Sequence, residues 1–150
     1  MAAFFAFLHH VAAFTLVAAL VVEFVLIRED LTVKRARSLQ LADAAIGALA
    51  GAVLVVGFLR VFYFEKGASY YFHSVPFIAK LSLFVVIALL SIYPTIEFLS
   101  WTKSLKQGQV PSISPLKLRA IRAIIHWELA GIVLLILCAA LMAKGIGYRG

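Results

Sequence analysis

Four long runs of apolar residues, separated by short polar stretches, set the pattern of this chain. The runs cover 4–27, 41–64, 76–99 and 121–143. A helix needs about 20 mostly apolar residues to cross the hydrocarbon core of a bilayer, and each run is long enough. Because lipid offers no hydrogen bonds to the backbone, we expect each run to be an α-helix. The runs also lack the alternation that is typical of membrane β-strands.

The polar stretches predict how these helices are arranged. They read REDLTVKRARSLQ, EKGASYYFHSV and SWTKSLKQGQVPSISPLKLRA, and we interpret them as loops. Short loops place sequential helices side by side and antiparallel. We therefore predict an all-α polytopic membrane protein, a single domain over 1–150 that forms an antiparallel four-helix transmembrane bundle. Pro94 should bend the third helix.

The first run is interpreted as a retained helix rather than a signal peptide. No basic segment precedes it, and it contains two histidines and Glu23.

Composition agrees with a lipid environment. Hydrophobic residues make up 64% of the chain, the mean hydropathy is +1.04, and 14% of residues are charged, whereas soluble domains carry about 25%. The lipid bilayer is therefore the expected partner. The net charge of +7 does not indicate nucleic acid, because almost all basic residues lie in the predicted loops. A single cysteine, Cys138, excludes an intramolecular disulfide and a CxxC motif.

The basic residues predict an orientation, because lysine and arginine concentrate in cytoplasmic loops. The first and third loops carry Arg28, Lys34, Arg35, Arg37, Lys103, Lys106, Lys117 and Arg119. The opposite side carries Lys66, Lys144 and Arg149. We therefore expect the first and third loops in the cytoplasm and both termini outside.

Ionisable residues within the runs fall into two layers. Such residues are costly in lipid and usually face the protein interior or a water-filled cavity. The layer toward the predicted outer face contains His9, His10, Arg60 and Lys80. The layer toward the inner face contains Glu23, Asp43, Glu97, His126 and Glu128.

The outer layer has the chemistry of a haem or porphyrin site. Imidazole ligates haem iron, zinc or copper, and Arg60 and Lys80 are suited to pair with propionates. A zinc site lacks a nearby cysteine or carboxylate, and no methionine cluster indicates copper. His9 and His10 point about 100° apart on a helix, so only one should face inward. His9 lies on nearly the same stripe as Glu23, which favours His9.

Lys80 has two interpretations. A lysine near the end of a span can extend its amine to water. Alternatively, Lys80 faces the interior, because Ser91 lies eleven residues later, about three turns along the same helix face. Serine is not expected to face lipid, so this spacing favours the interior for Lys80.

The inner carboxylates also have ordinary explanations. Glu23 has Arg28 nearby as a partner, and Asp43 lies near the start of the second run, where the helix dipole favours an acid. For Glu97 we favour a helix-end charge paired with a loop arginine. Glu128 lies deeper in the fourth run, which favours an interior-facing role.

The second run contains 47-GALAG-51, a GxxxG pattern. Small residues allow helices to approach closely in lipid. The pattern indicates either a homo-oligomer formed through the Gly47–Gly51 face or close packing within one bundle, and we favour the latter.

Three stretches carry a family resemblance: 8-LHHVAAFTLVAALVVEFVLIRE-29, 57-GFLRVFYFEKG-67 and 79-AKLSLFVVIALLSIYPT-95. Over about its full length the chain resembles an uncharacterised family of bacterial four-helix integral membrane proteins, a domain of unknown function. This resemblance implies the inner (cytoplasmic) membrane of a bacterium, so the orientation expected from the loop charges would place both termini in the periplasm.

More distantly, the chain is similar to the HemJ-type membrane protoporphyrinogen oxidase. The shared features are Leu8 with His9, Arg28, Lys80 with its following apolar run, and 122-RAIIHWE-128. In that family the helix-one histidine and helix-three lysine are associated with haem and activity. The chain departs from it in having Tyr93-Pro94 for a Tyr-His pair and no proline after Glu128.

Together these features predict a haem-binding membrane oxidoreductase. The resemblance implies haem b and dehydrogenation of a reduced tetrapyrrole, with electrons passed to a quinone. His9 or His10 would ligate the iron, Lys80 and Arg60 would bind carboxylates, and Glu128 would take part in proton movement. Two alternatives remain open: a proton or ion transport subunit, and a structural or assembly subunit of a membrane complex.

Overall fold

The computed structural model describes residues 1–64 and 71–147, and helices dominate these residues without any strand. The elements are α1 (Ala2–Leu26), α2 (Val33–Leu59), the π-helical segment η1 (Arg60–Phe64), α4 (Val75–Ser100), α5 (Thr102–Lys106) and α6 (Pro115–Ala143). Within the described ranges, four helices are long and apolar enough to cross a membrane. The predicted all-α membrane fold is therefore confirmed. Lys66 and Arg149, which entered the predicted orientation, lie outside the described residues.

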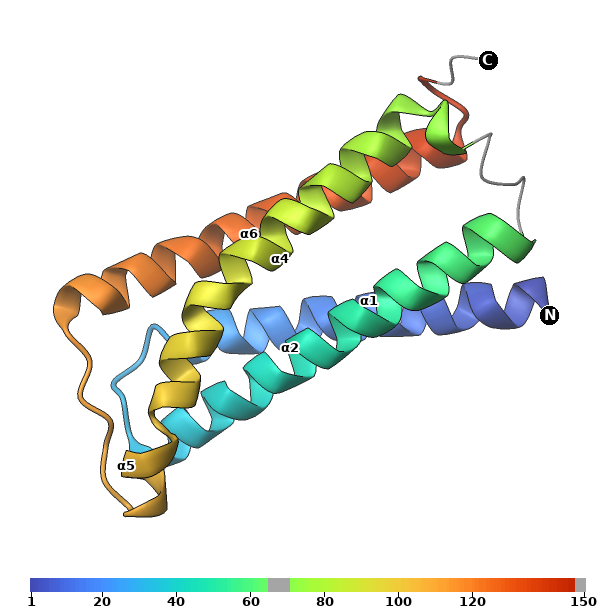
Figure 1. Ribbon diagram of the computed structural model, residues 1–150. Coiled ribbons are helices and arrows are strands. Elements are labelled where there is room, and N and C mark those ends of the chain that lie inside the picture. The colour runs from blue at the N-terminus through green and yellow to red at the C-terminus, as the bar shows by residue number, and fades with distance from the viewer. Residues whose placement is uncertain (65–70, 148–150) are drawn as a thin grey trace.

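The helices form two antiparallel hairpins. α1 packs mainly on α2, and α4 packs mainly on α6. Figure 1 shows both chain termini at one end of the bundle, here called the terminal end, and the α1–α2 connection and α5 at the opposite end, here called the loop end. The order of the helices is thus the antiparallel one that short loops predicted. The direction of the bundle across a membrane stays a prediction.

The helices start earlier than the apolar runs. α2 begins at Val33 and α6 at Pro115, so the interpretation of 33–40 and 115–120 as loop was wrong. Side-chain caps, rather than hydrophobicity, set these starts. The Thr32 hydroxyl accepts a hydrogen bond from the Arg35 amide, and the Ser114 hydroxyl accepts one from the Lys117 amide.

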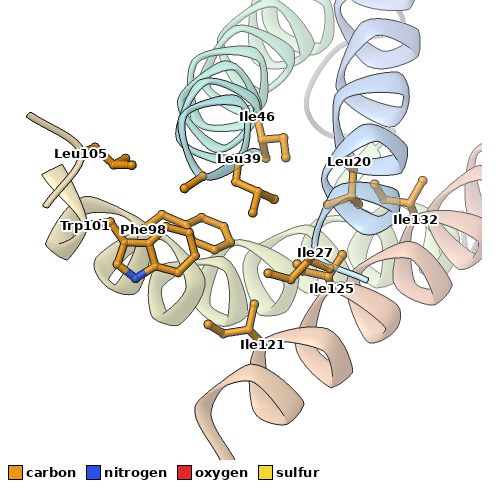
Figure 2. Packing of buried hydrophobic residues seen from close by; sticks show 11 residues of the cluster. Leu20, Ile27, Leu39, Ile46, Phe98, Trp101, Leu105, Ile121, Ile125 and Ile132 are labelled. Atoms are coloured by element: carbon orange, nitrogen blue, oxygen red, sulfur yellow. The ribbon is translucent and has the colours of Figure 1, made fainter. Parts of the chain in front are cut away.

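The hydrophobic core lies toward the loop end, where all four long helices meet. Figure 2 shows its aliphatic and aromatic side chains, among which Leu39, Phe98, Ile121 and Ile125 are fully buried. A second, smaller cluster near the terminal end contains Val61, Tyr71 and Phe77. Burial of apolar surface therefore joins the two hairpins more extensively at the loop end.

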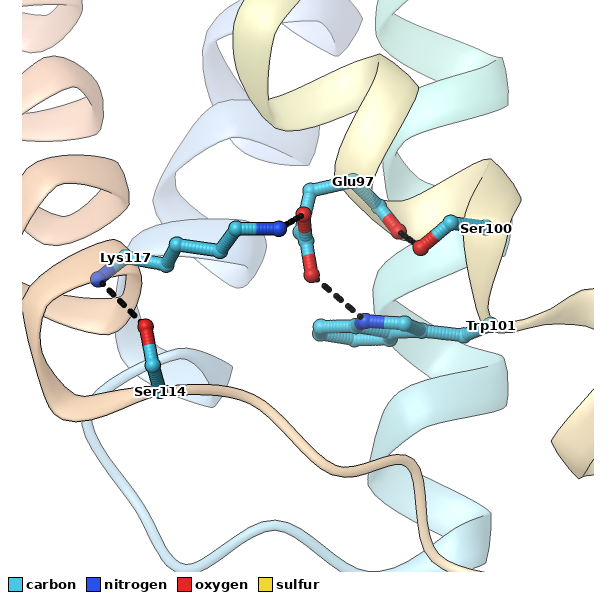
Figure 3. A network of polar contacts seen from close by, with 5 residues as sticks. All are labelled: Glu97, Ser100, Trp101, Ser114 and Lys117. Carbon is cyan, nitrogen blue, oxygen red and sulfur yellow. Dashed lines mark hydrogen bonds and ion pairs between the residues drawn. The ribbon is translucent and has the colours of Figure 1, made fainter.

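Polar side chains at the loop end donate hydrogen bonds to backbone carbonyl groups near the helix ends. Gln40 donates to the Phe98 carbonyl at 2.5 Å, and Arg122 donates to the Ile27 carbonyl at 2.9 Å. In Figure 3 the Glu97 carboxylate accepts hydrogen bonds from Lys117 at 2.9 Å and from the Trp101 indole at 3.3 Å. Glu97 thus lies near the end of α4 as expected, but the expected loop arginine was wrong, because its partner is Lys117 of α6.

The glycines of the predicted GxxxG face do not pack within the bundle. A Cβ atom added at Gly47 or Gly51 would meet nothing within 4 Å, so our preference for close intramolecular packing was wrong. Instead, Gly131 on α6 allows the close approach of α4, because a Cβ there would lie 2.7 Å from Cδ1 of Ile87.

Pro94 lies inside α4, which bends visibly in its yellow part in Figure 1.

Candidate functional site

A pocket with a volume of about 120 Å³ lies between the two hairpins near the terminal end. Most of its lining is apolar or aromatic. The lining residues are His9, Val53, Leu54, Gly57, Phe58, Arg60, Val61, Tyr71, Phe77, Lys80, Leu81, Phe84 and Met142. We call this the terminal pocket. Its basic groups, His9, Arg60 and Lys80, come from α1, η1 and α4, so the fold brings together three of the four residues of the predicted outer layer.

His9 enters the pocket because α2 leaves room for its ring. A Cβ atom at Gly57 would lie 3.3 Å from Cε1 of His9, so the glycine allows the imidazole to lie against the α2 backbone near Val53. The Nδ1 atom of His9 is buried, and no hydrogen-bond partner for it exists among the described residues. Such an atom in an apolar pocket is costly without a ligand.

His10 points away from the pocket. Its side chain is exposed, its Nδ1 atom is bonded to the Ala6 carbonyl at 2.6 Å, and its ring packs near that of Phe14. The rings of His9 and His10 are 6.1 Å apart and nearly perpendicular. The two histidines thus diverge as helical geometry requires, with His9 facing the interior.

Lys80 and Arg60 add positive charge to the pocket. Lys80 lies in the second turn of α4 and lines the pocket. Within the described residues, no carboxylate forms an ion pair with Lys80. Both side chains are within electrostatic range of His9. Arg60 begins the π-helical segment η1, and such segments occur frequently at functional sites.

Three carboxyl groups meet between the helices in the half of the bundle toward the loop end. Glu23, Asp43 and Glu128 are residues of which only 2%, 9% and 2% of the surface is exposed. We call these residues the carboxyl cluster. The Ser91 hydroxyl donates a hydrogen bond to Glu128, and the Thr95 hydroxyl donates one to Asp43 at 2.8 Å. Thr95 follows Ser91 by one helical turn, and this spacing is the signal in the sequence that places both hydroxyls on one face of α4.

Two of the sequence-based explanations for these carboxylates were wrong. Arg28 does not pair with Glu23, because its guanidinium lies over the ring of Phe24 at 3.9 Å from the centroid. Asp43 does not lie in the first turn of its helix, because α2 begins at Val33. The helix dipole therefore does not explain Asp43, and both acids face the interior of the bundle.

The terminal pocket and the carboxyl cluster are separate sites. His9 and Glu23 lie fourteen residues apart on α1, which corresponds to about 21 Å along a helix. Lys80 belongs to the pocket and Glu128 to the cluster, so the structure does not place these two residues in one site.

The family comparison covers both sites. A family model described as "Predicted membrane protein (DUF2214)" matches residues 1–147. The chain belongs to this family. The expected resemblance to an uncharacterised membrane protein family is thus confirmed. No curated protein and no solved structure matches the chain. Because the description of the DUF2214 family states no activity, the function has to be inferred from the sites themselves.

Proposed function

We propose that this DUF2214 protein is a haem-binding integral membrane oxidoreductase and that haem b binds in the terminal pocket. The observation that supports this is that His9 and Lys80 line the same apolar pocket. The Nδ1 atom of His9 has no hydrogen-bond partner among the described residues, and no described carboxylate forms an ion pair with Lys80. An imidazole is a common axial ligand of haem iron. Lysine and arginine side chains bind propionates through charge-assisted hydrogen bonds.

The side chains of the pocket are suited to bind haem, but the volume of the pocket is too small for it. The volume of about 120 Å³ is below the range of about 300–1,000 Å³ that is usual for small-molecule sites. Haem binding therefore requires the hairpins to move apart at the terminal end. The small apolar cluster at that end makes such movement less costly than it would be at the loop end, where the main core lies.

Bound haem would supply one-electron transfer in the membrane. His9 would hold the iron, Lys80 and Arg60 would neutralise the propionates, and the aromatic lining would exclude water. The resemblance to the HemJ-type enzyme supports a reduced tetrapyrrole as the substrate, which loses hydrogen atoms. A quinone that becomes a quinol would accept the electrons and protons.

An absorption spectrum tests this proposal. We expect the detergent-purified protein, produced with ample haem, to show a Soret band. His9→Ala should abolish the band, whereas the matched variant His10→Ala should retain it, because His10 faces away from the pocket. Colourless wild-type protein, or a band that is lost in His10→Ala and kept in His9→Ala, would overturn the proposal.

A proton or ion transport subunit is the second candidate, and the buried carboxyl cluster is the observation that favours it. Such a protein should support a proton-coupled flux into vesicles that depends on Lys80 or Glu128.

A structural or assembly subunit is the third candidate, and the open space around Gly47 and Gly51 is the observation that favours it. It should form a homo-oligomer or bind a larger complex through this face, and show neither a Soret band nor a flux.

A further inference from the structure

The carboxyl cluster draws one acid from each of three helices. Glu23 comes from α1, Asp43 from α2 and Glu128 from α6, while α4 contributes only the neutral hydroxyls of Ser91 and Thr95. Glu23 is within electrostatic range of both other acids. All four long helices therefore contribute to one buried polar site in the membrane-spanning part of the bundle.

Glu23 differs from its neighbours because no donor from the described residues bonds to its carboxyl. Asp43 and Glu128 each accept a hydroxyl hydrogen bond from α4. Among the described residues, no hydrogen bond or ion pair is formed by the Glu23 carboxyl, although its residue is 98% buried. This carboxyl thus lies in the site without a bonding partner.

Among the described residues, no cation forms an ion pair with the carboxyl cluster. On α6, the nearest arginine toward the loop end, Arg122, donates to the carbonyls of Ile27 and Arg28. On α1, the guanidinium of Arg28 lies over Phe24. The ion pairs found within the described part of the chain, Arg35–Glu29 and Lys117–Glu97, involve other acids.

Three ionised carboxylates would be unstable in this position. A charge is costly in the low-dielectric interior of a membrane bundle. Like charges that share a site also disfavour one another, so that at least one carboxyl takes up a proton. A metal ion would neutralise them instead, but the described residues include no group of three or more acids, histidines or cysteines with the geometry to hold one.

We propose that the carboxyl cluster is a proton-binding site and that Glu23 is the group that binds and releases the proton. The bound proton forms the O–H bond of a neutral Glu23 carboxylic acid, which can then donate to Asp43 or Glu128. Ser91 and Thr95 hold the other two carboxyls in place. This inference does not depend on haem, because the site lies apart from the terminal pocket.

Infrared spectroscopy of the protein reconstituted in lipid vesicles tests this directly. The wild type should show, at neutral pH, the carbonyl stretching band of a protonated carboxyl, with a shift in D₂O. Glu23→Gln should remove or strongly reduce the band. Glu29→Gln is the matched control, because Glu29 is exposed and paired with Arg35, so this variant should keep the band.

The experiment gives an answer even if one of the variants fails to fold. Gln has nearly the same shape as Glu, and circular dichroism checks that each variant remains helical. If Glu23→Gln does not fold, the wild-type spectrum still decides whether a protonated carboxyl exists. No such band in the wild type at neutral pH would overturn the proposal. A band that persists in Glu23→Gln and vanishes in Glu128→Gln would overturn the assignment to Glu23.

Discussion

Thr95 donates a hydrogen bond of 2.8 Å to the carboxyl of Asp43, and this bond joins α4 of one hairpin to α2 of the other. One turn earlier on α4, Ser91 donates to Glu128 of α6. Pro94 lies between the two hydroxyl residues and is itself buried. The bent segment of α4 is therefore the point at which both hairpins and the carboxyl cluster are held together.

Thr95→Val should destabilise the bundle. Valine preserves the shape of threonine but removes the hydroxyl, which leaves Asp43 buried without its donor. We expect the free energy of unfolding in detergent micelles to fall by about 1 kcal/mol, since interhelical hydrogen bonds in membranes contribute about 0.6–2 kcal/mol. Thr15→Val is the matched control, because the Thr15 hydroxyl is exposed and bonds only to Val11 of its own helix. Equal stability of the two variants would show that the Thr95–Asp43 bond does not join the hairpins.

Lys80→Met should stabilise the ligand-free protein. Methionine has a length similar to that of lysine but carries no charge, and no described carboxylate neutralises the charge of Lys80. The free energy of unfolding should therefore rise by about 1–2 kcal/mol, which is somewhat less than the cost of a lysine at the centre of a bilayer. If haem binds, the same variant should lower the haem content. The control is Lys117→Met, which breaks the ion pair with Glu97 and should not stabilise the protein. A loss of stability in Lys80→Met would contradict the expected cost of the amine in this pocket.

Gly131→Val should separate α4 from α6. A Cβ at Gly131 would lie 2.7 Å from the end of the Ile87 side chain, and overpacking in a protein interior costs about 1–3 kcal/mol. The double variant Gly131→Val with Ile87→Ala should recover part of this loss, because alanine vacates the space. Gly51→Val should leave the stability of the monomer unchanged, because nothing lies within 4 Å of a Cβ there. Thermal unfolding of the three variants in one detergent provides the comparison. If the double variant recovers no stability, the contact between Gly131 and Ile87 does not limit the approach of α4 to α6.

Gly147→Ala should release the residues that follow α6 from the start of α4. Gly147 has a φ of +81°, a Cβ there would lie 2.9 Å from Pro76, and its carbonyl accepts a hydrogen bond from the Val75 amide. A left-handed conformation costs a non-glycine residue about 1–2 kcal/mol, and the contact with Pro76 adds to this. Hydrogen exchange at the Val75 amide should therefore become faster.

Gly108→Ala is the control for this variant. Gly108 also has a positive φ, of 69°, but a Cβ there meets no atom within 4 Å. It lies at the loop end, so exchange at Val75 should not change. Unaltered exchange in Gly147→Ala would show that this contact does not hold the start of α4.

Hydrophobicity and charge predicted the fold class because the bilayer imposes a strict length and a helical backbone on any apolar span. The same reasoning gave the wrong helix starts, because α2 and α6 continue into polar segments that Thr32 and Ser114 cap. A capping residue acts through a local hydrogen bond, which an average over apolar residues does not detect.

The sequence by itself determined that this chain has four apolar helices, that His9 and His10 point in different directions, and that Ser91 shares a face with Lys80, since each follows from helical periodicity. Only the tertiary structure decided which helices supply each site. It placed His9, Arg60 and Lys80 around one pocket, assigned Glu128 to a different site, and buried Glu23 and Asp43 in the interior of the bundle. The physical reason is that periodicity fixes the direction of a side chain about its own helix axis, whereas the rotation and height of neighbouring helices depend on packing contacts such as that of Gly131 with Ile87.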